Sequence, residues 1–407
     1  MTDAHTAAAA RTRRLFDENS HLWKFDATVL DATSLEDGMT EILLDATAFF
    51  PEGGGQYADP GVLAGYPVVN VKDRKGVIVH TVDTRGADCA DVFRPGVQVH
   101  GEIDRAVRLV RMQNHSAEHI LSGLIHRDFG FSNVGFHLGD GDVTLDFNGV
   151  LTREQLDKLE DEANRVIAAN IPINAFYPSA EVLSDMTYRS KLSLTENVRI
   201  VEVGEGDGLI DRCACCAPHV SRTGEIGVIK LLDFMHYKGG VRIHMLAGSW
   251  ALADYRQRYT ATAHMAAAMS VKQGEVLDGF ARLQDEINTL KQTITTLRAK
   301  HEATVLAGLS PTQGSLCLFE EGLEALEMRR LLNGAVSRCG RLCGVFSGND
   351  TDGYRFVIGR GDPLLDLRAH ARDINTALSA RGGGSSEMLQ GSSTATRAEI
   401  EHFFSEF

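Results

Sequence analysis

Residues 115–129 read His-Ser-Ala-Glu-His-Ile-Leu-Ser-Gly-Leu-Ile-His-Arg-Asp-Phe, and they mark the point where the chain changes from short strands to a helix. Apolar residues share one face at helical spacing, which predicts a helix running toward Phe129: Ile120, Leu121, Leu124 and Ile125. His115 and His119 lie four residues apart on one face of that helix. This spacing lets two imidazoles bind the same metal ion.

A second group of metal-binding residue types lies in Cys213-Ala-Cys-Cys-Ala-Pro-His219. Such crowding favours reduced thiols over a disulfide framework. Two histidines from a helix, with one cysteine and one histidine from a distant loop, form a tetrahedral set suited to Zn²⁺. Cys215 and His219 have the spacing for this, while Cys213 and Cys216 stay open as the cysteine ligand. In the competing interpretation, Cys215 is a small buried apolar residue and His219 a core histidine.

Glu118 allows a second interpretation of this motif. His115-Ser-Ala-Glu118-His119 also fits the H-x-x-E-H pattern of inverted zinc peptidases. In such an enzyme the glutamate would be the general base for a zinc-bound water. The simpler alternative is a solvent-facing carboxylate on the helix. A peptidase would also need a third ligand that is usually a carboxylate, whereas the Cys/His loop offers two ligands of another kind.

Before this helix, short β-rich stretches alternate with Gly, Asp and Pro, which predicts a small barrel or curled sheet. They are Val29–Leu30, Ile42–Leu44, Val68–Val71, Val77–Val79 and Val97–Ile103. Between them lies Thr47-Ala-Phe-Phe-Pro-Glu-Gly-Gly-Gly-Gln56. Its three glycines permit positive φ angles and close approach to a ligand, although a sharp turn between strands is the simpler explanation of the run alone.

After the helix, strands and helices are mixed, which predicts an α+β middle part. Thr152 is the expected N-cap of a helix to about Ala169. The expected strands are Phe131–Phe136, Val143–Phe147, Val198–Val203, Val228–Leu232 and Val241–Leu246.

From about Trp250 to Lys300 the sequence predicts one uninterrupted helix. Its apolar seam alternates steps of four and three over three heptads: Val276, Phe280, Leu283, Ile287, Leu290, Ile294 and Leu297. The seam indicates either a helix packed on its own domain, or a coiled coil or helical hairpin.

A last α/β part begins near Ser310. Its expected elements are strand Leu316–Phe319, helix Leu323–Ser337, strands Leu342–Phe346 and Arg355–Gly359, and helix Leu364–Leu378. Arg381-Gly382-Gly383-Gly384 and Gln390-Gly391 follow. Glycines beside a basic residue suit either a phosphate-binding turn or a flexible loop.

The composition is that of an ordinary soluble globular protein: 407 residues, 43% hydrophobic and 24% charged, with seven cysteines. No apolar stretch approaches a membrane span and the N-terminus does not resemble a secretory signal, so we expect a cytoplasmic protein. There are 41 basic and 55 acidic residues, a net charge of −14. Nucleic acid would therefore have to bind through a local basic patch instead of the overall field.

Together these segments resemble the editing half of alanyl-tRNA synthetase, and still more its free-standing relatives, the AlaX-type alanyl-tRNA editing proteins. The resemblance rests on the order of Thr47–Gln56, the H-x-x-x-H helix and the C-x-x-x-H loop. It also rests on 135–139, 143–147, 198–200 and 240–243. The tail with Gly382–Gly384 and Gln390-Gly391 resembles the DHHA1 domain of the synthetase and of long AlaX proteins. The zinc loop departs from the common Cys-Gly-Gly-Thr-His at Cys216, Ala217 and Pro218.

The resemblance implies that His115, His119, Cys215 and His219 are zinc ligands and that Thr47 and Gln56 belong to the substrate pocket. It implies tRNA binding by Arg381, Gly382, Gly383, Gly384 and Gln390, and also ATP and nucleotide binding. The implied segments are an N-terminal β-barrel-like domain with the Gly-rich motif (1–110), a zinc-binding editing domain (111–249), a helical or coiled-coil linker (250–304) and a DHHA1-like domain (305–407).

The implied reaction is hydrolysis of the ester that joins serine or glycine to alanine tRNA, catalysed by a trans-editing aminoacyl-tRNA deacylase. Thr47 is our candidate for the group that recognises the serine hydroxyl, because alanine would leave such a group unpaired. A homodimer through the helical and C-terminal segments is a further expectation. The alternatives are the zinc peptidase and a non-enzymatic tRNA-binding or dimerising module with a structural zinc. Aminoacylation is not expected, since the editing-like region begins near Trp23.

Overall fold

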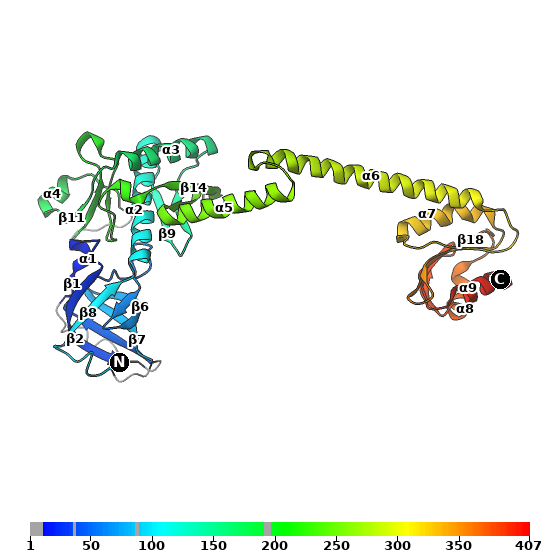
Figure 1. The fold of residues 1–407 in the computed structure, drawn as a ribbon, viewed down its shortest axis with the longest axis horizontal. Helices are drawn as coiled ribbons and strands as arrows, with labels where there is room; N and C mark the ends of the chain where they lie inside the picture. The colour runs from blue at the N-terminus through cyan, green and yellow to red at the C-terminus, as the bar shows by residue number, and fades with distance from the viewer. Residues whose placement is uncertain (1–10, 36–37, 86–88, 191–196) are drawn as a thin grey trace. The chain divides into compact units, whose positions relative to one another are not determined.

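The computed structural model of the chain describes residues 11–35, 38–85, 89–190 and 197–407. Helices and strands are mixed within these ranges (Figure 1), which confirms the α+β class expected from the sequence. The chain divides into two units, Met1–His264 and Met265–Phe407.

Six strands of the first unit close into an antiparallel barrel in the order β2–β3–β7–β6–β5–β8. Side chains alternate between buried and exposed along these strands, so that one set fills the barrel, as Phe25, Ala27 and Val29 do. The short strands β1 and β4 pair in parallel beside it. The elements of this part are β1 (Arg13–Arg14), α1 (Leu15–Glu18), β2 (Lys24–Ser34), β3 (Met39–Leu44), β4 (Ala46–Thr47), β5 (Gly61–Leu63), β6 (Tyr66–Arg74), β7 (Val77–Asp83) and β8 (Gln98–Ile103).

The helix α2 (Arg105–Phe129), cyan in Figure 1, runs from the barrel into the α+β part of the first unit. Its N-cap is Asp104, whose carboxylate accepts the backbone N–H groups of Ala106 and Val107. The helix therefore begins earlier than the change of sequence period at His115 indicates. Most side chains from Val110 to Ile125 are buried, so α2 carries its two histidines through the interior of the unit.

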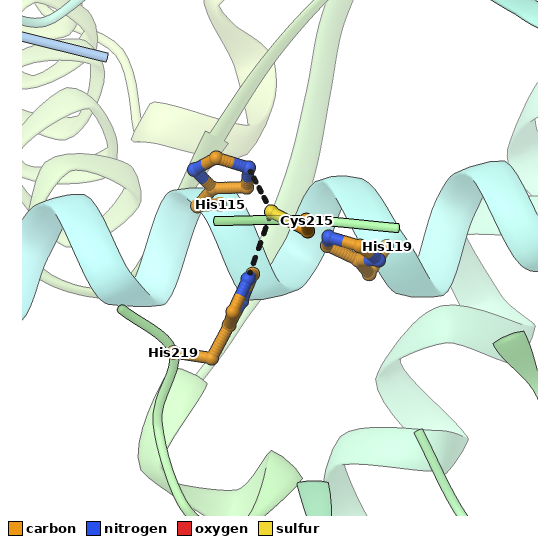
Figure 2. A group of neighbouring side chains, drawn as sticks. All are labelled: His115, His119, Cys215 and His219. Atoms are coloured by element: carbon orange, nitrogen blue, oxygen red, sulfur yellow. Dashed lines mark hydrogen bonds between the residues drawn. The ribbon is translucent and has the colours of Figure 1, made fainter. Parts of the chain in front are cut away.

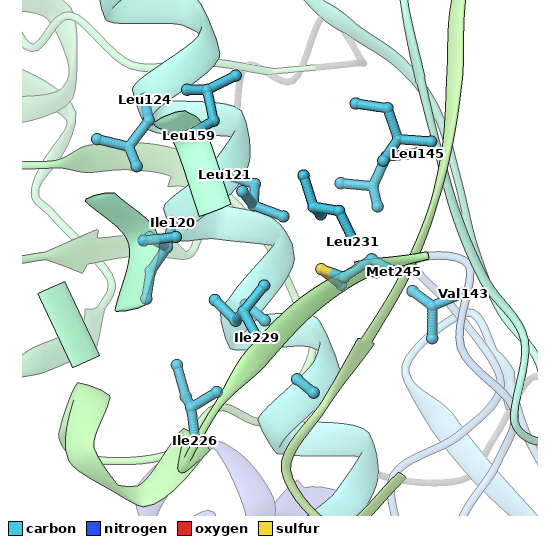
Figure 3. Close-up of a cluster of buried hydrophobic side chains, with 14 of the residues drawn as sticks. Ile120, Leu121, Leu124, Val143, Leu145, Leu159, Ile226, Ile229, Leu231 and Met245 are labelled. Carbon is cyan, nitrogen blue, oxygen red and sulfur yellow. The ribbon is translucent and has the colours of Figure 1, made fainter. Parts of the chain in front are cut away.

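The α+β part surrounds α2 with a four-stranded antiparallel sheet in the order β14–β15–β10–β9 and a three-stranded antiparallel sheet in the order β11–β12–β13. Figure 3 shows part of the apolar core of this part, in which Leu121 of α2 lies beside Leu231. The elements are β9 (Asn133–Leu138), β10 (Val143–Phe147), α3 (Arg153–Ala169), β11 (Ile173–Phe176), α4 (Ala180–Asp185), β12 (Ile200–Val203), η1 (Gly206–Gly208), β13 (Asp211–Ala214), η2 (Thr223–Ile226), β14 (Ile229–Tyr237) and β15 (Gly240–Ala247).

The helix predicted as uninterrupted is in fact two helices, α5 (Gly248–Ala268) and α6 (Val276–Gly308). Ser270 adopts a left-handed φ of 54°, and the N–H of Val271 bonds back to the carbonyl of Ala266. This is the geometry of a Schellman motif, which ends a helix. The sequence did not indicate the end because serine, not glycine, occupies the left-handed position.

The apolar seam of α6 is exposed. Relative exposure is 43–62% for Phe280, Leu283, Ile287, Leu290, Ile294 and Leu297. The end of α6 packs instead through Val305 and Leu306 on the core of the second unit. The interpretation in which this seam packs on its own domain is therefore wrong for these six residues. Among the helices in the described ranges, none has the length and apolarity that crossing a membrane requires.

The second unit contains a five-stranded sheet in the order β16–β17–β18–β20–β19, in which only the β16–β17 pair is parallel. One face packs on α7 and the other on α8 and α9, so two clusters of apolar side chains cover the sheet. The elements are η3 (Gln273–Glu275), β16 (Leu316–Phe319), α7 (Ala325–Ala335), η4 (Val336–Arg338), β17 (Leu342–Asn349), β18 (Gly353–Arg360), α8 (Leu367–Ala377), β19 (Ala380–Gly384), β20 (Met388–Ser393) and α9 (Arg397–Glu406).

The glycine-rich tail is a β-hairpin. The sequence had predicted either a flexible loop or a phosphate-binding turn here, and both predictions of its backbone structure are wrong. Gly382 pairs with Gly391, and Gly383 with Gln390, across β19 and β20. A Cβ on Gly382 would lie 2.7 Å from Gln390 O, and one on Gly391 would lie 2.2 Å from Arg381 O. These two glycines therefore allow close packing of the strands.

Candidate metal centre

Three imidazoles and one thiol from two distant segments meet beside α2. His115 and His119 project from α2, while Cys215 and His219 come from the segment after β13 (Figure 2). The four donor atoms all lie within 4.8 Å of one another. The structure thus brings together the four ligands named from the sequence.

Each histidine is oriented by a partner at its Nδ1 atom. His115 Nδ1 lies 3.1 Å from Gln56 Oε1, His119 Nδ1 lies 2.8 Å from Asp211 Oδ2, and His219 Nδ1 lies 3.1 Å from Ser116 Oγ. Gln56 Oε1 and the Asp211 carboxylate can only accept, so the first two Nδ1 atoms donate. This leaves the Nε2 lone pairs available, which is the usual arrangement of histidines that bind a metal.

The donor distances fit a tetrahedral zinc ion. With Zn–S about 2.3 Å and Zn–N about 2.0–2.1 Å, sulfur and nitrogen are about 3.6 Å apart. Cys215 Sγ lies 3.5 Å from His115 Nε2 and 3.4 Å from His219 Nε2. The donor set of three nitrogens and one sulfur also suits Zn²⁺ chemically.

The electrostatics distinguish the three cysteines. Burial alone would raise the pKa of the Cys215 thiol, but the imidazoles of His115 and His219 outweigh it and hold this pKa well below its usual value. Burial raises the pKa values of Cys213 and Cys216 to about 11. Because a thiolate is the metal ligand, Cys215 is the cysteine best suited to the site.

A second group, His119, Asp211 and Cys213, is also compact enough to hold a metal. Asp211, however, receives both the Nδ1–H of His119 and two N–H groups of Arg189, at 2.7 and 2.8 Å. Burial would raise the pKa of Asp211, but Arg189 and His119 outweigh it and hold the pKa at about 2. Asp211 therefore orients His119 and does not form a second metal site.

The glycine run lies against the four-donor cluster. Gly54 and Gly55 have φ values of 62° and 82°, and a Cβ on Gly54 would lie 3.8 Å from His115 Cε1. A Cβ on Gly55 would meet Phe136 O at 2.6 Å. The glycines thus let the backbone approach closely enough for Gln56 to reach His115.

Gln56 is buried, and its amide nitrogen has no hydrogen-bond partner among the described residues. Such a donor normally finds a partner, which makes it a candidate contact for a bound molecule or a water.

Thr47, expected in the substrate pocket, lies instead in the barrel interior and is fully buried. His80 Nδ1 lies 3.2 Å from the carbonyl of Ile42, and His80 Nε2 lies 2.8 Å from Thr47 Oγ1. Burial lowers the pKa of His80 to about 4, so His80 is neutral and accepts the hydroxyl proton of Thr47. Oγ1 also accepts the N–H of Phe49. The geometry therefore gives this hydroxyl a structural role, not a substrate contact.

A cavity of about 470 Å³ opens beside three of the ligands, His115, His119 and Cys215. Three arginines and two aromatic side chains are among the other residues that line it: Arg14, Gly54, Gly55, Glu118, Phe136, Tyr177, Arg189, Ser190, Asn197, Arg199, Cys213, Ala214 and Cys216. The expectation of a solvent-facing Glu118 is wrong, since this side chain is only 4% exposed and lines the cavity. No spacing rule pointed to the arginines or to Tyr177, because they come from separate loops and strands.

The residues proposed for tRNA binding belong to the second unit. Arg381, Gly382, Gly383 and Gly384 lie on the exposed edge strand β19, and Gln390 bonds to Arg329 of α7. The structure does not bring these residues together around a cavity or an anion-binding turn.

The chain is similar to known alanyl-tRNA synthetases and to an alanyl-tRNA editing protein. Residues 198–244 match the family described as the threonyl and alanyl tRNA synthetase second additional domain. An alanine–tRNA ligase of Halorubrum lacusprofundi is 30% identical over 392 residues, which are 92% of this chain and 40% of the ligase. The alanyl-tRNA editing protein AlaX-L of Pyrococcus horikoshii is 23% identical over 399 residues, 95% of this chain and 96% of that protein. The C-Ala domain of Aquifex aeolicus alanyl-tRNA synthetase covers 22% of this chain at 19% identity with a TM-score of 0.19.

By sequence, the chain is a relative of alanyl-tRNA synthetases, and it spans 40% of the length of the H. lacusprofundi enzyme. It is also a homologue of the alanyl-tRNA editing protein AlaX-L, which it matches over nearly the whole length of both chains.

Proposed function

We propose that the chain is a trans-editing hydrolase that deacylates alanine tRNA mischarged with serine or glycine, and that its site holds one Zn²⁺. The observation that carries the proposal is the four-donor cluster of His115, His119, Cys215 and His219 at the wall of a cavity that three arginines also line. Similarity to AlaX-L over the whole chain supports the same activity.

The size and lining of the cavity suit the end of an aminoacyl-tRNA. A volume of about 470 Å³ is in the range of small-ligand sites and fits an amino acid on a terminal nucleoside. Arg14 and Arg199 supply positive charge for the phosphate that precedes this nucleoside. Phe136 and Tyr177 offer aromatic faces on which a base can stack.

The chain's own residues hold and orient the substrate at this wall. Arg199 also fixes the ligand loop, because it donates to the carbonyls of Cys215 and Ala217 at 3.1 and 2.8 Å. Gln56 orients His115 and keeps an amide N–H group for a substrate or water. When bound, Zn²⁺ would supply Lewis-acid chemistry beside the ester.

The two alternatives differ from this proposal in what they require. A peptidase of the H-x-x-E-H type would use Glu118 as base and a third metal ligand that is usually a carboxylate, whereas the donors that join the two helix histidines are Cys215 and His219. A structural zinc in a non-enzymatic module would give metal and tRNA binding without hydrolysis. The cavity beside three of the ligands favours the enzyme.

The test is a deacylation assay of the full chain on seryl-, glycyl- and alanyl-charged alanine tRNA. We expect seryl or glycyl ester to be hydrolysed faster than alanyl ester by at least an order of magnitude. An absence of hydrolysis on all three substrates, with tRNA and zinc bound, would establish the non-enzymatic module.

For the second unit we propose tRNA binding and self-association. Six apolar seam residues of α6 are exposed at heptad spacing, as expected of a helix that pairs with a second copy. Arg381 on β19 supports tRNA contact through its charge and exposure. ATP binding remains a prediction from the family resemblance, and a cytoplasmic location follows from the proposed substrate.

A further inference from the structure

Glu118 is a buried carboxylate at the wall of the cavity, and the proposed deacylation gives it no role so far. It projects from α2, one residue before a proposed metal ligand. Its Oε1 atom accepts the hydroxyl proton of Ser122 at 2.7 Å and an amide N–H of Asn133 at 2.6 Å. Two side chains from α2 and β9 therefore hold the carboxylate in one orientation.

The second carboxylate oxygen faces the donor cluster. Oε2 of Glu118 lies 3.8 Å from His119 Nε2, the atom that points to the other three donors. Glu118 itself is not one of the four clustered donors. Its carboxylate therefore stands beside the metal donors instead of among them.

Glu118 also supplies the cavity's negative charge. Among the described residues that line the cavity, it is the one with a carboxylate. The cavity arginines have acidic partners outside its lining: Arg189 pairs with Asp211, Arg14 with Asp73 and Arg199 with Asp17. A cationic group that entered the cavity would meet its opposite charge at Glu118.

We propose that Glu118 binds the α-ammonium group of the aminoacyl ester and so makes the site select amino acids whose amino group is free. This inference rests on the proposed deacylase function. The α-nitrogen lies about 2.5 Å from the ester carbonyl carbon. With a charged hydrogen bond of about 2.8 Å, the carboxylate oxygen that holds it lies within about 5 Å of that carbon. A carboxylate next to the metal donors satisfies this requirement.

The test measures binding, so that it does not depend on hydrolysis. The probes are adenosine carrying serine at its 3′ position through a non-hydrolysable amide, and the same compound with an N-acetyl group. Affinities are measured by calorimetry on the zinc-loaded full chain. We expect the free-amine compound to bind about ten- to hundredfold more tightly, the range of one charged hydrogen bond.

Glu118→Gln keeps an oxygen for Ser122 and Asn133 but removes the charge. It should reduce the preference for the free amine to about twofold or less, with zinc content unchanged. Glu162→Gln, which alters a surface carboxylate paired with Arg127, is the matched control and should keep the full preference. Ser122→Ala keeps the charge and the hydrogen bond from Asn133 but removes one of the two donors that orient Glu118. It should lower the preference only in part, and it tests the same role if Glu118→Gln loses its zinc.

Equal binding of both compounds by the unaltered chain would overturn the inference, as would a full preference retained in Glu118→Gln. The proposed function is tested separately by the deacylation assay. Hydrolysis without amine preference refutes only the role of Glu118, and amine preference without hydrolysis refutes only the deacylase.

Discussion

Gln56 follows the glycine run, and its side chain contacts one of the proposed metal ligands. It accepts the Nδ1–H of His115, and no second acceptor for this proton is present among the described residues. Gln56→Leu keeps the approximate size of the side chain and removes the acceptor. We expect zinc affinity to fall about ten- to hundredfold, the usual effect of losing such a partner.

This affinity is measured by competition with a chelator of known strength. Gln98→Leu on the exposed side of β8 is the matched control and should leave the affinity unchanged. If Gln56→Leu binds zinc as tightly as the unaltered chain, the orientation of His115 by Gln56 is refuted.

Thr47 gives a prediction of a different kind. Thr47→Val would leave His80 Nε2 without its donor in the fully buried barrel interior. We expect the free energy of unfolding to fall by about 1–3 kcal/mol, with seryl and glycyl ester hydrolysis altered in parallel. Chemical denaturation and the deacylation assay measure the two effects.

The control for Thr47→Val is Thr33→Val, at an exposed position of β2. A selective loss of seryl ester hydrolysis, with unfolding unchanged, would instead restore serine recognition by Thr47.

At the level of residues, the sequence predicted which four donor side chains come together, because metal chemistry restricts their types and spacing. It did not predict Asp211 or Arg189, since the orienting partner of a histidine can come from any strand that passes nearby. It misplaced Thr47 because the partner that decides its role, His80, lies on a neighbouring barrel strand.

Among the elements, α6 yields the clearest prediction. Its exposed apolar seam is expected to pair with the seam of a second copy, so Ile287→Lys should place a charge in that interface. We expect analytical ultracentrifugation to show a dimer for the unaltered chain and a monomer for the variant, both with full zinc content.

Gln284→Lys, a charge beside the seam on the polar side of the helix, should remain a dimer. A chain that is already monomeric at high concentration would contradict the proposed pairing.

Elements with regular apolar periods were predicted well, as the match of β10 to Val143–Phe147 and of α3 to its Thr152 cap shows. The end of α5 was missed because a serine adopts the left-handed conformation. The hairpin of β19 and β20 was missed because glycines rarely form strands, and only their close packing explains them.

On the scale of the whole molecule, the two units give a prediction about tRNA. Trp250 and Ala251 pack on the core of the first unit, so a truncation that respects this core ends after Ala268. Residues 1–268 should keep their zinc but bind tRNA at least tenfold more weakly than the full chain. Binding by the full chain should weaken with rising salt, because an acidic protein contacts phosphates through local Lys and Arg. Equal tRNA affinity of both chains would contradict a role of the second unit in binding.

The most direct test of the account is the composition of the metal site. Elemental analysis and zinc-edge X-ray absorption should find one zinc per full chain, bound by three nitrogens at about 2.0–2.1 Å and one sulfur at about 2.3 Å. His115→Ala and Cys215→Ala should each lose most of the metal. Two or more sulfur ligands, or full retention of zinc in both variants, would contradict the site formed by His115, His119, Cys215 and His219.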